Sequence, residues 1–109
     1  MAETVLGADY ELSLVFIGST RSRALNKQHR GKDRPTNILS FPLEEEAGEI
    51  YIALRLAESE ASKFNMKPRS FVAYLFLHGL LHLKGYDHGS TMERKEDVLL
   101  QRFGFERPS

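Results

Sequence analysis

The sequence predicts an α+β domain in which a small mixed β-sheet lies beside a group of helices. Two observations lead to this fold class. Three short segments rich in β-formers lie in the first half of the chain, whereas most segments with helical periodicity lie in the second half. Because strands and helices are largely segregated along the chain, we expect one sheet with the helices packed on it. At 109 residues, residues 1–109 are expected to form a single domain.

Three segments have the composition and the alternation of strands. In the second segment, alternation places Leu39, Phe41 and Leu43 on the face opposite to Ile38 and Ser40. The acidic stretch 43–48 that follows is short enough for a hairpin-like connection to the third segment. The strands are expected over residues 12–17, 36–43 and 49–54.

Four helices are expected between and after these strands. Ser19 or Thr20 offers an N-cap for the first helix, which ends near Gly31. The third helix is apolar on nearly every side, which is typical of a helix buried between other elements. Ser90 and Glu93 form a capping-box pattern that opens the last helix. The helices are expected over residues 21–29, 53–64 and 69–83, and from residue 90 onwards.

The composition excludes several classes of protein. No apolar run approaches the roughly 20 residues that a membrane-spanning helix needs. The chain has no cysteine, which excludes disulfides and thiolate metal sites. Residues 1–10 lack the apolar core of a signal peptide. A cytoplasmic protein without a membrane partner is therefore the simplest expectation.

Positive and negative charges are concentrated in different stretches, although 15 basic and 15 acidic residues balance to a net charge of zero. Acidic residues dominate between positions 44 and 60. A basic stretch lies between positions 21 and 34, and it either attracts an anionic partner or forms a solvated helix face. No aromatic stacking platform is evident beside it, so we expect weak sequence recognition. The basic residues are Arg21, Arg23, Lys27, Arg30, Lys32 and Arg34.

Three of the four histidines lie within eleven residues around the end of the apolar helix. His78 and His82 are four residues apart and share a helix face. Gly85 favours a helix end, and His88 follows in the exit turn. Three imidazoles that converge suit one tetrahedral zinc ion whose fourth position stays open to water, as in catalytic sites. A hydrogen-bonded histidine cluster is the alternative, but the helix offers few polar partners.

The residues beside these histidines indicate which metal-dependent reactions are expected. The spacing of the three histidines matches the long zinc-protease motif, which needs a glutamate after the first histidine as the general base. Gly79 occupies that place, so a metalloprotease is not expected; glycine there also lets another backbone pack closely. Asp87 precedes His88, where it either orients a ligand imidazole or serves as a turn residue.

Two segments resemble a known family. Residues 78–88 read HGLLHLKGYDH, which resembles the signature HGxLHLxGYDH of the YbeY endoribonucleases. Residues 35–42 read PTNILSFP and follow Asn26, Arg30 and Lys32-Asp33, in the order of the family's second conserved block. Gly48-Glu49-Ile50 resembles the family's GDI, with glutamate in place of aspartate. The likeness extends over about residues 11–105.

The resemblance implies both an activity and a site. The family fold is α+β with a small mixed sheet, similar to the minimal core of zinc proteases. The implied protein is a zinc-dependent endoribonuclease, with one zinc ion per chain, that cuts single-stranded RNA. It matures the 3′ end of small-subunit rRNA, acts in ribosome quality control and contacts the small ribosomal subunit. The family's metal ligands correspond to His78, His82 and His88, and its catalytic positions to Arg30 and His78.

One departure from the family concerns the N-terminus. Family members usually carry a further strand and helix in front, and residues 1–10 are too short to form both. We therefore expect a shortened N-terminal edge of the sheet and an altered part of the RNA-binding surface.

Two other functions stay open at this stage. The same metal site would suit a zinc hydrolase of another substrate class, although Gly79 argues against a peptidase. A non-catalytic module associated with the ribosome, in which zinc only stabilises the fold, would need a fourth protein ligand. His29 is the one remaining histidine for that role.

Overall fold

The computed structural model describes residues 5–85 and 90–104, and within them it shows three strands and four α-helices. None of the helices in this described part is long and apolar enough to cross a membrane. The elements in chain order are β1 (Glu11–Ile17), α2 (Ser19–Arg30), β2 (Ile38–Glu44), β3 (Ala47–Ala53), α3 (Leu54–Glu60), a 3-10 helix (Ala61–Phe64), α4 (Pro68–Lys84) and α5 (Ser90–Arg102).

The sheet is mixed, as predicted, and has the strand order β1-β3-β2. β1 pairs with β3 in parallel, and β2 pairs with β3 in antiparallel register. The β2–β3 hairpin forms where the acidic stretch predicted it, with a register shift between Pro42 and Glu44. Because β3 lies in the centre, β2 is an edge strand, and its outer edge is free to line a cleft.

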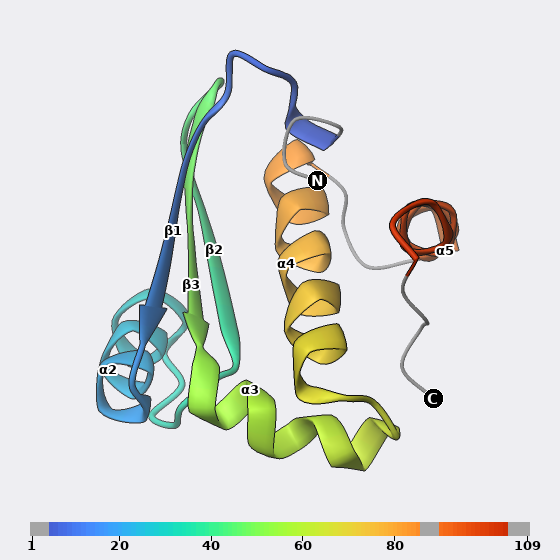
Figure 1. The fold of residues 1–109 in the computed structure, drawn as a ribbon. Helices are drawn as coiled ribbons and strands as arrows, with labels where there is room; N and C mark the ends of the chain where they lie inside the picture. The colour runs from blue at the N-terminus through green and yellow to red at the C-terminus, as the bar shows by residue number, and fades with distance from the viewer. Residues whose placement is uncertain (1–4, 86–89, 105–109) are drawn as a thin grey trace.

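The main core lies between the sheet and α4. Ile50 and Ile52 of β3 are fully buried and face α4, whose Leu77 and Leu80 are also fully buried. α4 runs along one face of the sheet, and α5 lies on the other side of α4 (Figure 1). This position between two layers explains why α4 is apolar on most sides. Full burial of each such side chain contributes about 1.5–3 kcal/mol to the free energy of unfolding.

α2 lies on the opposite face of the sheet from α4 (Figure 1). Its buried polar side chains tie it to the segment before β2. The Ser22 hydroxyl donates to the Thr36 carbonyl oxygen at 2.6 Å and accepts from the Thr36 amide at 2.9 Å. The Asn26 side-chain amide donates to the Arg34 carbonyl oxygen at 2.8 Å. These bonds fix the position of the C-terminal turn of α2, which ends at a left-handed Gly31.

Two helix boundaries differ from the sequence prediction. The N-cap of α2 is Gly18, not Ser19 or Thr20, because Gly18 is extended and its carbonyl oxygen accepts from the Ser22 amide at 3.0 Å. The helix expected over 53–64 is α3 followed by a 3-10 turn, because the chain tightens before Asn65 takes a left-handed conformation with φ 55°. The predicted end of α4 at Gly85 is confirmed, with φ 105°.

Gly79 is a point of close approach between α4 and the sheet. A Cβ atom there would lie 2.9 Å from the Ser40 Oγ, 3.0 Å from the Ile38 Cδ1 and 3.1 Å from the Ile50 Cδ1. The close neighbours are thus side chains of the sheet rather than the backbone that the sequence suggested. A larger residue at this turn of α4 would therefore have to displace the ends of these three side chains.

We predict that Gly79→Ala lowers the free energy of unfolding by about 1–2 kcal/mol, because overpacking outweighs the gain in helix propensity. Urea unfolding followed by circular dichroism measures the change. Ile38→Val removes the Cδ1 atom that the new methyl group would meet, so the double variant should lose less stability than the sum of the two single variants. A Gly79→Ala protein as stable as the wild type would show that the sheet and α4 do not pack this tightly.

Candidate active site

A cleft of about 720 Å³ runs along the edge of β2. One wall is the last turn of α2, with His29 and Arg30, and the other wall is α4, with His78 and His82. The floor is the strand itself over residues 38–42. The cleft therefore joins two layers that lie on opposite faces of the sheet, and it does so at the sheet's edge.

The imidazoles of His78 and His82 converge in this cleft, as the i, i+4 spacing predicted. Their Nε2 atoms are 3.1 Å apart, and the ring planes are nearly perpendicular, at 79°. Two nitrogens bound to one tetrahedral zinc ion at 2.0–2.1 Å would be about 3.3 Å apart. The observed pair thus fits two ligands of a single metal ion, with little movement of either ring.

The carboxylate of Glu96 in α5 contacts the second ring nitrogen of His78, the Nδ1. Its Oε1 lies 2.9 Å from the His78 Nδ1, and the residue is only 2% exposed. An ionised carboxylate can only accept a hydrogen bond, so this contact favours the tautomer in which the Nδ1 carries the proton and donates it. The lone pair of His78 then lies on the Nε2, which is the atom that faces His82.

The sequence analysis missed Glu96, although a signal was present. Glu96 precedes Leu100 by four residues and therefore shares the face of α5 that packs into the core. A carboxylate on the apolar face of a helix needs a partner, because an unpaired buried charge is costly. The position of Glu96 on that face pointed to a buried polar contact, but its partner lies on another helix.

The third expected ligand, His88, and the expected orienting residue Asp87 lie outside the described residues. Within residues 5–85 and 90–104, no group of three or more potential ligands gathers tightly enough to hold a metal ion. Asp87 and His88 are two of the four residues between Gly85 and Ser90. His88 thus belongs to the short segment that joins the helix bearing His78 to the helix bearing Glu96.

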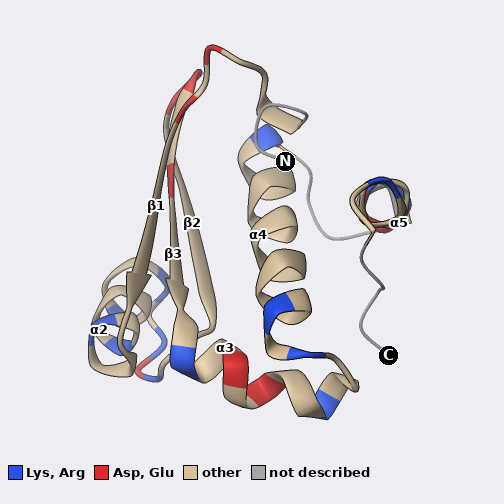
Figure 2. Cartoon of the chain, in the orientation of Figure 1, with Lys and Arg blue, Asp and Glu red and all other residues tan. Residues whose placement is uncertain are grey.

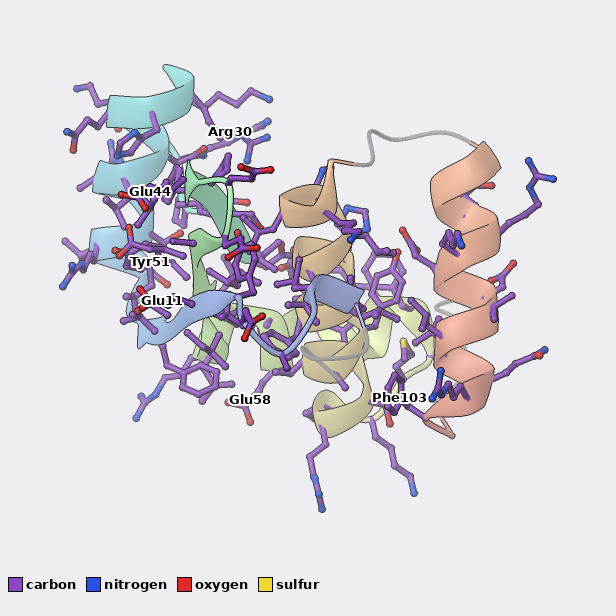
Figure 3. The ribbon with its side chains drawn as sticks, turned by 90° about the horizontal axis from the view of Figure 1, so that it is seen from above. Glu11, Arg30, Glu44, Tyr51, Glu58 and Phe103 are labelled. Carbon is purple, nitrogen blue, oxygen red and sulfur yellow. The ribbon has the colours of Figure 1, made fainter. Side chains whose placement is uncertain are left out.

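Arg30 lines the same cleft as the imidazole pair, on the wall formed by α2. It is exposed, and it lies at the end of α2 (Figure 3). The bonds of Ser22 and Asn26 hold the helix to the segment before β2, so its last turn has a fixed place beside the cleft. A guanidinium in that position can donate two parallel hydrogen bonds to a phosphate.

The other basic residues divide into two groups. Lys32 and Arg34 line a second pocket of about 400 Å³, which shares Arg30, Thr36 and Asn37 with the cleft. This pocket therefore continues the cleft towards more positive charge. Lys and Arg gather on α2 and in the loop after it, whereas acidic residues gather at the β2–β3 hairpin and on α3 (Figure 2).

The second group consists of Arg21, Arg23 and Lys27, which do not line the cleft. The Arg23 Nε donates to the Asp33 carboxylate at 2.7 Å, and the Lys27 Nζ lies 3.9 Å from its other oxygen. The hydrogen bond from Arg23 lowers the pKa of Asp33 and raises that of Arg23. Arg21 lies over the ring of Tyr51, 5.9 Å from its centroid. Arg23 and Lys27 are thus partly neutralised by Asp33.

The expectation that no aromatic platform accompanies these residues was wrong. His29 packs on Phe41 with ring centroids 4.5 Å apart, and Phe41 meets Tyr51 at 5.8 Å. The rings come from α2, β2 and β3, so they are far apart in the sequence and meet only in the fold. Strand alternation placed Phe41 on the face away from α4, but it gave no indication of its partners.

The remaining polar side chains of the cleft belong to its floor. Thr36, Asn37 and Ser40 all line it. The Asn37 side-chain amide donates to the Glu60 carboxylate at 3.2 Å, which holds it in place. The cleft therefore combines three imidazoles, one guanidinium and a row of small polar groups, a set that suits a metal-assisted reaction of an anionic substrate.

Known proteins share this chain's sequence and fold. A family model described as Endoribonuclease YbeY matches residues 1–104. Endoribonuclease YbeY of Geobacillus kaustophilus is 37% identical, over 89% of this chain and 75% of that protein. Endoribonuclease YbeY of Desulforamulus reducens is 39% identical, over 91% of this chain and 76% of that protein.

A solved structure also matches this chain in fold and in sequence. The solution structure of a Thermotoga maritima protein matches with a TM-score of 0.68 and 33% identity, over 94% of this chain and 74% of that chain. Together with the family model and the relatives, this likeness shows that the chain belongs to the endoribonuclease YbeY family.

Proposed function

We propose that the protein is a zinc-dependent endoribonuclease that cuts single-stranded RNA in the cleft beside β2. The observation that carries this proposal is the convergence of the His78 and His82 Nε2 atoms, 3.1 Å apart, in a cleft whose other wall presents Arg30. Membership of the endoribonuclease YbeY family supports RNA as the substrate.

His78, His82 and His88 are the proposed zinc ligands. A zinc ion held by neutral imidazoles lowers the pKa of bound water and polarises a phosphoryl oxygen. Glu96 keeps the proton of His78 on the Nδ1, so that the Nε2 lone pair is available on the side of His82. Asp87 is proposed to orient a ligand imidazole in the same way. His78 is thus both a ligand and a member of the catalytic set.

Arg30 is the proposed stabiliser of the transition state. Cleavage of a phosphodiester builds additional negative charge on the phosphoryl oxygens. A guanidinium aimed at those oxygens stabilises that charge more than it stabilises the ground state, and this difference accelerates the reaction. Arg30 is exposed and lines the cleft, so it can reach a phosphate without a change in the fold.

The substrate strand is proposed to leave the cleft over Lys32 and Arg34, which line the adjoining pocket. Arg21, Arg23 and Lys27 contribute a weaker attraction to the phosphate backbone, since Asp33 partly neutralises the last two. We propose that the natural substrate is the 3′ end of small-subunit rRNA. The protein would then work in the cytoplasm, in contact with the small ribosomal subunit, during rRNA maturation and ribosome quality control.

The charge of the cleft argues against a peptidase. Among the described residues that line it, none carries a carboxylate that could act as the general base for peptide cleavage. Gly79 stands where that glutamate would be, and a larger side chain there would have to displace the Ile38 and Ser40 side chains. The arrangement favours an anionic substrate that brings its own hydroxyl groups.

Two substitutions test the proposal. His82→Ala should lose zinc and RNA cleavage together, because it removes one ligand. Arg30→Ala should keep one zinc ion per chain and lose cleavage by about 100-fold or more, as expected for a group that acts on developing charge. Metal analysis and gel assays on an unstructured RNA measure both effects, with casein and a chelator as controls. Cleavage of RNA by a zinc-free wild-type protein would overturn the proposal.

Glu96 provides a second test, with a readout that does not depend on activity. Glu96→Gln should weaken zinc binding by about 10-fold and Glu96→Leu by up to about 100-fold, the range found for residues that orient metal ligands. Competition with a chromophoric chelator measures the dissociation constant. Glu58→Gln on the exposed face of α3 is the matched control and should leave the dissociation constant for zinc unchanged. If all three variants bind zinc as the wild type does, Glu96 does not orient His78.

A further inference from the structure

Three rings form an aromatic row beside the cleft, and we use that name for His29, Phe41 and Tyr51. His29 is exposed, and the other two are half-buried. Phe41 lies between its partners, with centroids 4.5 Å from His29 and 5.8 Å from Tyr51. The Tyr51 hydroxyl donates to the Glu49 carboxylate at 3.1 Å, which fixes the last ring of the row.

The row begins in the cleft and continues onto the outer face of the sheet. His29 and Phe41 both line the cleft, whereas Tyr51 does not line it and lies on the α2 side of the sheet (Figure 3). Arg30 follows His29 directly in the chain and lines the same wall. The open end of the row is therefore adjacent to the proposed phosphate-binding guanidinium.

Packing alone does not account for these rings. The main core consists of residues between the sheet and α4, and in the described part of the chain neither Phe41 nor Tyr51 belongs to it. The buried hydrogen bonds of Ser22 and Asn26 already anchor α2. Exposed His29 gains little from burial, so its ring has a face that a ligand can cover.

Flat exposed rings beside cations are the common feature of surfaces that bind single-stranded nucleic acid. A nucleobase stacks on an aromatic ring through its π-face, and neighbouring arginines hold the phosphates. In the row, the exposed ring of His29 and the half-buried ring of Phe41 lie beside such cations, because Arg30 follows His29 in the cleft and Arg21 lies 5.9 Å over Tyr51 at the other end. A peptide would need neither the flat rings nor the cations.

We propose that the aromatic row is a base-stacking subsite, in which a nucleobase next to the scissile phosphate stacks on His29 and Phe41 while Arg30 holds the phosphate. This inference rests on the proposed endoribonuclease function. Because every base has a π-face, the subsite selects single-stranded RNA, whose bases are free, without selecting a particular sequence. It thereby gives a physical reason for single-strand specificity.

The test combines substitutions in the protein with abasic nucleotides in the RNA. The zinc-loaded protein cuts a short unstructured RNA at a mapped position, and one abasic nucleotide is moved along that RNA. In the wild type, we expect kcat/KM to fall by about 5- to 100-fold when the abasic nucleotide lies beside the cleavage position, the range that stacking of one base accounts for. In Phe41→Leu and in His29→Gln, the same abasic nucleotide should cost less than about 3-fold, because the ring it would stack on is absent.

Three further variants complete the design. Phe41→Tyr keeps an aromatic ring and should restore the abasic penalty. Phe16→Leu changes a phenylalanine that is 53% exposed on β1 and lies outside the cleft, so it should behave as the wild type. His29→Trp adds the only tryptophan of the chain, and its fluorescence should be quenched when a 2′-O-methyl RNA oligonucleotide, checked by gel to remain intact, is bound.

The outcomes separate the subsite from the function itself. If the wild type does not cut RNA, the proposed function fails. If it cuts RNA but the abasic penalty is the same in the wild type, Phe41→Leu and His29→Gln, the function stands and the subsite is wrong, which would leave packing or a protein partner as the role of the row. Should Phe41→Leu fail to fold, His29→Gln on the exposed side of α2 decides the question alone.

Discussion

The close packing of α4 against the sheet at Gly79 is the constraint on which the site depends. A helix that approaches a sheet this closely can present side chains at the sheet's edge only from the turns next to the contact. His78 is adjacent to Gly79, and His82 follows one turn later, so both imidazoles reach the cleft beside β2. The contact that stabilises the fold is therefore also the one that directs two nitrogen atoms to one point.

The second helix layer completes this arrangement. α5 packs on α4 from the side away from the sheet and brings the buried carboxylate of Glu96 to the His78 Nδ1 (Figure 1). One ring nitrogen is thus held by the protein interior, and the other is directed towards His82. On the far wall, the buried hydrogen bonds of Ser22 and Asn26 fix the turn that carries Arg30. The His78 imidazole and the helix turn that carries Arg30 are thus both held by buried hydrogen bonds.

Local patterns in the sequence predicted much of this fold, because they depend on neighbouring residues. The all-round apolar α4, the left-handed Gly85 and the alternation from Ile38 to Phe41 agree with the structure. The alternation fails at Leu43, which is 60% exposed, because the strand register shifts between Pro42 and Glu44. Contacts between residues that are far apart in the sequence could not be predicted in this way. The partner of Glu96 lies eighteen residues away, and the rings of the aromatic row come from three elements, so no sequence period reveals them. The N-cap of α2 differed because Gly18 satisfies the helix start through its backbone alone.

The spacing of the histidines predicted the pairing of His78 with His82, and the central claim extends that pairing to a zinc ion. X-ray absorption at the zinc edge of the zinc-loaded protein examines the claim directly, since the chain has no cysteine to add sulfur scattering. The account predicts one zinc ion per chain with three imidazole nitrogens at about 2.0–2.1 Å and one further light ligand. A shell made only of oxygen, or one with fewer than two imidazoles, would contradict it.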